Sequence, residues 1–377
     1  MAAHALLSAS SAARWLHCPP SVRLTEKLPD TASRYAAEGT LAHAMAEDML
    51  RAFIAGKRWR LTKRFKNDPL FYEGMAEDVR PYVDYVEDAF AAAGKGAALD
   101  VEARLDFSEV VPQGFGTGDA VITAPGRLEI VDLKFGKGVV VDAEDNPQIM
   151  LYGLGALLAY DFIYDIGEIR MTIVQPRLDH VSSFAMSADA LRRWSEDVVR
   201  PRAKLAYAGE GERAAGDWCR WCKIKASCRV RAQAMLAVAD KRTRAQLTDT
   251  ELSEILAQRE AIKNWLTDVE GGVMDRLLRG ESLAGWKLVE GRSNRKVCDA
   301  DGLAEALTAR YSADEIYKPR ELKTITALEK LHGKKAFAED FAAYIEKPPG
   351  KPTIAPESDK RPAIGTPETQ FEFEDLQ

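Results

Sequence analysis

The chain has 377 residues, of which 46% are hydrophobic and 29% charged, and this composition is typical of a globular protein with a substantial core. The formal net charge is −6, so any affinity for nucleic acid must come from a local basic patch rather than from the whole surface. Charges interrupt every apolar run, which argues against a membrane span, and the sequence contains no G-x-x-x-x-G-K-[ST] string. We therefore expect no membrane partner and no nucleotide cofactor.

The N-terminal segment begins with a mildly apolar run but has no basic stretch before it, so we expect it to be part of the fold and not a signal peptide. A cytoplasmic location follows as the expectation. In a reducing compartment, the five cysteines are better interpreted as metal ligands or buried thiols than as disulfides.

The hydrophobic periodicity predicts elements of both kinds. Helices are expected over 36–55 and 70–92, followed by strands over 98–107, 116–123 and 127–135. Asn146 and Pro147 are a helix-start signal for 148–160, because Asn caps a helix and Pro suits its first turn. A strand over 167–176 and a helix over 187–207 follow. This order predicts an α/β fold with a central mixed sheet flanked by helices.

Composition also divides the chain. Residues 1–235 carry the mixed α/β pattern, and 236–346 are expected to form a mainly helical accessory domain. Residues 347–377 are rich in Pro and polar residues, so we expect this tail to be largely disordered.

The strongest chemical signal is acidic and lies in a predicted hairpin that turns at Pro125-Gly126. If Ala124 faces Arg127, the register places Asp119 opposite Asp132, with Cβ atoms roughly 5 Å apart on one face. Lys134 lies two residues beyond Asp132 and therefore points to the same face. Two carboxylates and an ammonium can hold Mg²⁺ or Mn²⁺ and assist phosphodiester hydrolysis. An isolated Asp-x-Lys more often marks a solvated strand, but Asp132 interrupts an apolar run and needs a partner. Glu102, on the preceding strand, either joins this face or is solvated.

The order of several motifs resembles the RecB-like branch of the PD-(D/E)XK nucleases. The resemblance rests on Glu38-Gly-Thr-Leu-Ala-His43, Gly116-Thr-Gly-Asp119, Asp132-Leu-Lys134 and Gln148-x-x-x-Tyr152, within residues 1–235. It implies a PD-(D/E)XK restriction-endonuclease-like core in which His43, Asp119, Asp132 and the backbone carbonyl of Leu133 bind Mg²⁺ or Mn²⁺. It also implies that Lys134 is the catalytic lysine, and that Gln148 and Tyr152 lie near the substrate on one helix face.

Four cysteines suggest a second metal site. Cys219, Cys222 and Cys228 form C-x₂-C-x₅-C, and Cys18 lies about two hundred positions upstream. Four thiolates suit an iron–sulfur cluster, with zinc as the direct competitor. This layout resembles the AddB and CRISPR-associated RecB-like exonucleases, which implies a [4Fe–4S] cluster that pins the ends of the nuclease domain together. Cys298 stands apart and is interpreted as an ordinary thiol.

A basic segment over 57–66 is the candidate DNA-binding surface. Its cationic residues alternate with Trp59 and Phe65, so phosphates could be neutralised while the rings stack on unpaired bases. A solvated basic loop is the alternative interpretation. The candidate contacts are Lys57, Arg58, Arg60, Lys63 and Arg64.

Residues 328–341 and 350–363 are similar to an uncharacterised family of phage and prophage proteins with the same nuclease core. The resemblance implies a DNA nuclease, most simply an exonuclease acting on ends or single strands, in phage DNA replication or recombination. Its partners would be DNA and other phage replication or recombination proteins in the cytoplasm of a bacterial host. Two alternatives stay open: a DNA-binding recombination module that does not cut, and an interaction protein stapled by zinc.

Overall fold

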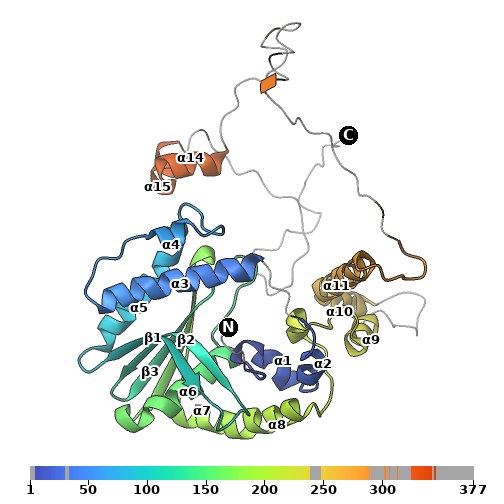
Figure 1. The fold of residues 1–377 in the computed structure, drawn as a ribbon, viewed down its shortest axis with the longest axis horizontal. Coiled ribbons are helices and arrows are strands. Elements are labelled where there is room, and N and C mark those ends of the chain that lie inside the picture. Colours follow the sequence, from blue (N-terminus) through green and yellow to red (C-terminus); the bar gives the residue numbers. More distant parts are fainter. Residues whose placement is uncertain are drawn as a thin grey trace. The chain divides into compact units, whose positions relative to one another are not determined.

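The computed structural model describes residues 5–29, 34–237, 248–287, 289, 301–302, 305, 312, 324–341 and 344. The chain divides into two compact units, Met1–Ala284 and Gly285–Gln377. The first unit contains a sheet with helices on both faces (Figure 1). It extends past residue 235, so the helices just after that position group with the sheet by their contacts.

The helices of the first unit follow the predicted order and add several short elements. They are η1 (Ala9–Ser11), α1 (Ala12–His17), α2 (Ser21–Thr25), α3 (Arg34–Ile54), α4 (Lys63–Lys66), α5 (Met75–Ala93), α6 (Pro147–Tyr164), η2 (Pro176–Leu178), α7 (Ala188–Trp194), η3 (Ser195–Val199), α8 (Arg200–Ala208), η4 (Asp217–Trp221), α9 (Arg229–Ala237), α10 (Asp249–Ala257) and α11 (Arg259–Leu278).

The sheet has five strands in the order β1-β2-β3-β4-β5. The strands are β1 (Ala98–Asp106), β2 (Phe115–Ala124), β3 (Arg127–Leu133), β4 (Glu168–Gln175) and β5 (His180–Ser187). Only β3 and β4 pair in parallel; the other three pairs are antiparallel. Helix α6 supplies the crossover that a parallel pair requires. The coarse prediction of a mixed sheet flanked by helices is confirmed.

The hairpin and the start of α6 form as their sequences predict. Ala124 pairs with Arg127, and Gly126 has φ +78°, a conformation that glycine adopts without steric cost. The side chain of Asn146 accepts a hydrogen bond of 3.0 Å from the backbone N–H of Gln148, with Pro147 in the first turn. Both ends of the segment that carries Asp132 and Lys134 are therefore fixed by local signals.

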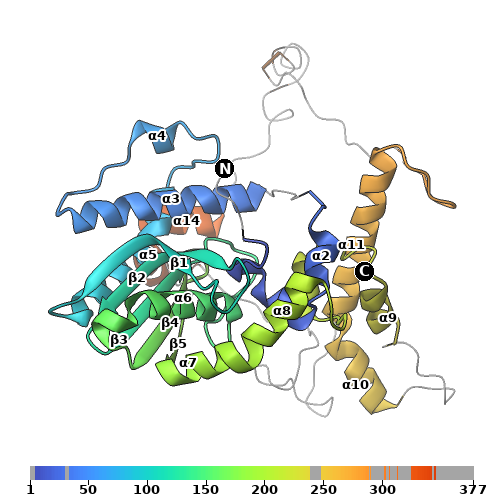
Figure 2. The same cartoon turned by 60° about the horizontal axis from the view of Figure 1, so that its bottom comes forward.

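Two hydrophobic cores cover the two faces of the sheet. One lies between the sheet and helices α3 and α5, and it includes Met45, Val79 and Val131. The other lies between the sheet and helices α1, α6, α7 and α8, and it includes Trp15, Leu154 and Ile130. The turned view shows α3 and α7 on opposite sides of the strands (Figure 2). The sheet is thus the middle of three layers.

The sequence-based order lacks β5, which is a correction. Residues 180–187 pair with β4 as an antiparallel edge strand, where a helix was predicted to begin at 187. Burial alternates along β5: Phe184 and Met186 are partly buried, whereas Val181 and Ala185 are exposed. Asp179, with φ +51°, makes the reversal between β4 and β5 without a Gly or Asn to signal it.

The described part of the second unit is small. It contains α14 (Ile325–His332) and α15 (Lys334–Asp340), in which Phe337 is buried. Residues 347–377 and Cys298 lie outside the described residues. Within the part of the chain that the structure describes, no helix combines the length and the apolar character needed to cross a bilayer.

Candidate functional site

The site begins at an interruption in the pairing of β1 with β2. Glu102 and Asp119 lie between the pairs Val101↔Ala120 and Ala103↔Gly118. Glu102 has φ +53°, which for a residue with a side chain stores about 1–3 kcal/mol of strain. Strand alternation changes phase here: Val101 packs towards α3 and α5, whereas Leu105, four residues on, packs in the α6 core. The two carboxylates therefore leave the regular alternation of the sheet.

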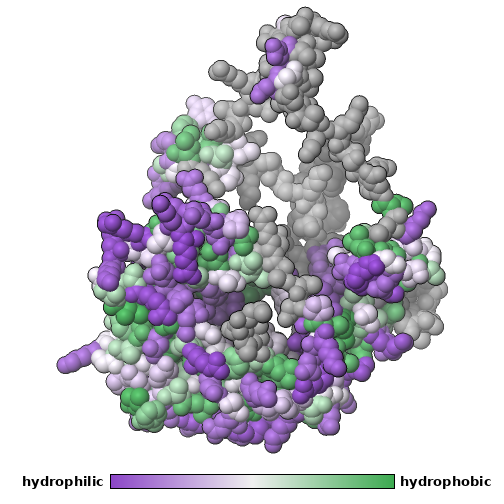
Figure 3. All heavy atoms as spheres, viewed as in Figure 1, coloured by the Kyte–Doolittle hydropathy of each residue, from purple (hydrophilic) through white to green (hydrophobic). Residues whose placement is uncertain are grey.

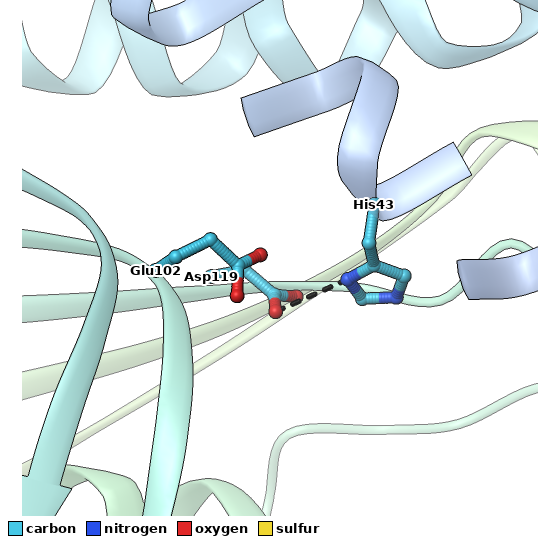
Figure 4. A group of neighbouring side chains, drawn as sticks. All are labelled: His43, Glu102 and Asp119. Atoms are coloured by element: carbon cyan, nitrogen blue, oxygen red, sulfur yellow. Dashed lines mark hydrogen bonds and ion pairs between the residues drawn. The ribbon is translucent and has the colours of Figure 1, made fainter. Parts of the chain in front are cut away.

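The displaced carboxylates meet a histidine from α3. Nδ1 of His43 lies 3.1 Å from Oδ1 of Asp119, and Glu102 lies beside them (Figure 4). One potential ligand atom from each of these three residues lies within 4.8 Å of the others. Burial and the neighbouring Asp119 charge raise the pKa of Glu102 to about 7. Burial lowers the pKa of His43, but the charge and hydrogen bond of Asp119 raise it by more.

Asp132 and Lys134 form the second half of the site, at the carboxyl end of β3. Nζ of Lys134 lies 2.7 Å from Oδ2 of Asp132, whose side chain is only 4% exposed. The Lys134 ammonium is thus the charged partner of this buried carboxylate oxygen. Burial and then Asp119 raise the pKa of Asp132, although Lys134 opposes them. A divalent cation beside this carboxylate would further offset the free-energy cost of burying its charge.

Asp119 connects the two halves. Its Oδ2 accepts a hydrogen bond of 2.7 Å from the backbone N–H of Leu133. The last pair between β2 and β3 is Ala120↔Val131, so this bond ties the strands together one step beyond their regular ladder. The ladder therefore has the predicted register, although it ends one pair before Asp119 and Asp132. The side chain of Asp119 is directed towards His43 of α3 and the backbone N–H of Leu133.

Helix α6 brings the predicted Gln148 and Tyr152 to the same site. Nε2 of Gln148 donates to the hydroxyl of Tyr152 at 3.2 Å. Burial and then the charge of Asp132 raise the pKa of Tyr152 to about 12, so the phenol faces the carboxylate as a neutral group. Gly116 permits this approach, because a Cβ atom there would lie 2.5 Å from the Tyr152 ring.

The donor set fits a hard divalent cation better than a soft one. His43, Glu102, Asp119 and Asp132 offer carboxylate oxygens and one imidazole, which suit Mg²⁺ or Mn²⁺. The specific observation behind this fit is that His43, Glu102 and Asp119 each offer a ligand atom within 4.8 Å of the others.

The four predicted cysteines also converge. Cys18 follows α1, Cys219 lies in η4, and all four thiols line one cavity of about 170 Å³. Burial raises the pKa of the Cys219 and Cys222 thiols, and neighbouring cysteines add to the rise. His17 stacks on Trp218 with ring centroids 4.1 Å apart, so the residues that precede Cys18 and Cys219 hold the two segments together. The chemistry of four thiols around a cavity suits a cluster or a metal ion.

Most of the chain matches one protein family. Residues 4–362 match the model of a family described as "Protein of unknown function (DUF2800)". The chain belongs to this family. A solved structure titled "Crystal structure of SSO0001" is similar at 10% identity and a TM-score of 0.27, over 59% of this chain and 84% of that chain. The match to DUF2800 spans both compact units, and the site described above lies entirely in the first.

The basic segment of this DUF2800 chain is only partly as predicted. The side chains of Lys57, Arg58, Arg60, Lys63 and Arg64 are exposed, and hydrophilic residues cover this region over α3 and α4 (Figure 3). The aromatic rings are not available in the predicted way. Phe65 is 1% exposed and belongs to the core, and Nε1 of Trp59 donates to Asp48 at 2.7 Å. Base stacking by Phe65 is therefore corrected, whereas contacts to phosphates stay a prediction.

Glu102 is the member of the site that the sequence left open. The alternation of apolar and polar residues around Glu102 does not predict a break in the strand, because the φ of +53° at this residue is set by tertiary packing. The glycines at 116 and 118 on the facing strand were the available signal of an irregular strand, and the structure packs Tyr152 against Gly116 and Leu105 against Gly118.

Proposed function

We propose that this protein is a metal-dependent deoxyribonuclease with a RecB-like PD-(D/E)XK core, acting on DNA ends or single strands. The observation that carries the proposal is the convergence of His43, Glu102 and Asp119, whose potential ligand atoms lie within 4.8 Å of one another, beside the buried ion pair of Asp132 with Lys134. The finer fold assignment, and a role in phage or prophage DNA replication or recombination, are parts of the same proposal.

The chain's residues have distinct roles in this proposal. Asp119, Asp132, His43, Glu102 and the carbonyl of Leu133 would bind the ion. Bound Mg²⁺ or Mn²⁺ supplies Lewis acidity towards a phosphate and lowers the pKa of water. Lys134 holds an ammonium beside Asp132, where it can orient the attacking water or offset charge on the phosphate. Gln148 and Tyr152 position the substrate from α6.

Glu102 strengthens the case for a cation at this position. Its carboxyl, with a pKa of about 7, shares one small volume with Asp119 and His43. Backbone strain at a residue that carries a carboxylate into such a group is typical of functional sites. A divalent ion would take the place of the proton on Glu102 and offset the repulsion that the ionised carboxylate would otherwise meet from Asp119.

The cysteines support a second part of the proposal, a structural [4Fe–4S] cluster. The four thiols line one cavity of about 170 Å³, a donor set that accepts either a cluster or a zinc ion, and the resemblance of the cysteine spacing to the AddB type favours the cluster. Nothing in the described chain offers an electron-transfer role, so the cluster is proposed to hold η4 against α1. Iron and sulfide analysis of anaerobically purified protein, with its absorbance spectrum, separates the cluster from zinc.

The test is digestion of end-labelled single- and double-stranded DNA with Mn²⁺ or Mg²⁺. Wild-type protein is expected to cleave, and Lys134→Ala is expected to be slower by about 10²–10³-fold, as for loss of one transition-state donor. Lys95→Ala, an exposed lysine between α5 and β1, is the matched control and should cleave normally. Tight DNA binding without cleavage under any of these conditions would instead identify a recombination module that does not cut.

A further inference from the structure

A second, part-buried ion pair joins Glu38, the first residue of the motif that ends at His43, to Arg177, which belongs to none of the motifs discussed above. Arg177 is in η2, directly after β4, and its Nη1 lies 2.5 Å from Oε1 of Glu38 on α3. The two side chains are 15% and 17% exposed. Glu38 lies five residues before His43, about one and a half turns along the same helix.

The same guanidinium also contacts the segment that follows Lys134. Nη1 of Arg177 lies 3.5 Å from the carbonyl oxygen of Phe135, and the guanidinium carbon lies 4.8 Å from the centre of the Phe135 ring. The Tyr72 ring, 5.8 Å away, contacts it as well. Both distances are within the range of cation–π attraction. One side chain thus joins α3 to the carboxyl end of β3.

These two elements carry the two halves of the site. Helix α3 supplies His43, and the end of β3 supplies Asp132, the Leu133 backbone and Lys134. The first described residue of α3 is Arg34, so the Glu38 pair fixes the helix near its start. Because Glu38 and His43 share this helix, a small rotation of α3 at Glu38 would displace the His43 imidazole from Asp119.

We infer that Arg177 is a positioning residue that sets the distance of His43 from the carboxylates of β2 and β3; this role rests on the proposed metal centre. The Nε of Arg177 is buried and has no hydrogen-bond partner among the described residues. The side chain is therefore held by the pair with Glu38 and by the two rings rather than by a full set of hydrogen bonds.

The experiment compares Arg177→Gln with Arg200→Gln as a matched control. Arg200 makes the same two kinds of contact, an ion pair with Glu196 at 2.6 Å and a bond of 2.7 Å to the carbonyl of Glu109, but on α8. Mn²⁺ dissociation constants are measured by calorimetry. We expect Arg177→Gln to weaken binding about 10-fold, the low end for residues that support metal ligands, and Arg200→Gln to leave it unchanged.

A second readout needs no metal and no activity. The protein has five histidines, so the imidazole ¹H–¹⁵N resonances of His43 can be assigned in the metal-free state. At fixed pH they should move in Arg177→Gln and not in Arg200→Gln. Wild-type protein that binds Mn²⁺ but leaves DNA intact would refute the nuclease and leave this test standing.

Glu38→Gln covers the case in which Arg177→Gln does not fold. It removes the ion pair but keeps Arg177 between the two rings, and it should weaken Mn²⁺ binding in the same direction. Because the two side chains act as a unit, the double variant should be no weaker than the worse single variant. Unchanged Mn²⁺ affinity and unchanged His43 resonances in folded Glu38→Gln or Arg177→Gln would overturn the inference.

Discussion

The acidic site and the cysteine site are built in opposite ways. In the acidic site, regular elements deliver the side chains, and each charge already has a protein partner: Asp132 has Lys134, and Asp119 has His43 and the Leu133 N–H. In the cysteine site, short segments from distant parts of the chain bring thiols together, and burial raises the pKa of two of them. The first site is organised before any ion binds, whereas the second depends on what it binds.

This contrast predicts that the largest effect on stability comes from a cysteine. Cys18→Ala should yield an unstable, colourless protein, because in the proposed cluster Cys18 would close a loop of about two hundred residues, worth on the order of 5 kcal/mol by loop-closure entropy. Thermal unfolding and the visible spectrum are the measurements, and Cys298→Ala is the control. A brown, fully folded Cys18→Ala variant would show that Cys18 is not a ligand.

Removing the metal ion from the acidic site should reduce activity without reducing stability. Brief treatment with EDTA is expected to abolish cleavage and to leave the melting temperature almost unchanged, because the protein's own pairs hold the carboxylates in place. Restoring Mn²⁺ should restore activity in full. A large drop in melting temperature with no loss of iron would mean that the acidic site, too, needs its ion to fold.

Glu102→Gln tests the contribution of one residue of the acidic site to metal binding and to stability. We expect Mn²⁺ binding to weaken by about tenfold, as for loss of one supporting ligand. In the metal-free protein, the pKa of Glu102 is about 7, above the unfolded value of about 4.3, so the folded state keeps a proton that the unfolded state has lost. Wild-type stability should therefore fall as pH rises between these values.

The Glu102→Gln variant should lose that part of the pH dependence. Urea unfolding at pH 5 and pH 8 in the presence of EDTA measures it. An equal change in stability for the two proteins would mean that Glu102 is ionised in the folded state. The carboxylates of Glu102 and Asp119 would then repel each other less than their proximity indicates.

The smallest effect should come from the basic segment. Replacing Lys57, Arg58, Arg60 and Lys63 by Ala should reduce the slope of log affinity against log salt by about 0.7 for each single-strand phosphate that is no longer neutralised. Exposed basic residues of α7 and α8 serve as the control set: Arg193, Arg202 and Lys204. An unchanged slope would show that this segment does not contact the DNA phosphates.

What the sequence predicted well depends on local signals. The hairpin register follows from Pro125-Gly126, and the start of α6 follows from Asn146-Pro147, so Asp132, Lys134, Gln148 and Tyr152 could be placed from sequence. The break at Glu102 could not be predicted, because its φ is fixed by packing on both faces of the sheet. Likewise, the burial of Phe65 depends on contacts with α3 and α5 that the basic pattern conceals.

The N-terminal helices make their contacts very late in the chain. Nε of Arg23 donates to the carbonyl of Tyr207 at 2.7 Å, and Nζ of Lys223 donates to the carbonyl of Leu28 at 2.8 Å. On a ribosome adding about 5–20 residues per second, these partners would be synthesised on the order of 10–40 s after α1 and α2. During that interval Trp15 and Leu16 have no α8 to pack against, so the nascent chain exposes an apolar segment that a chaperone can bind.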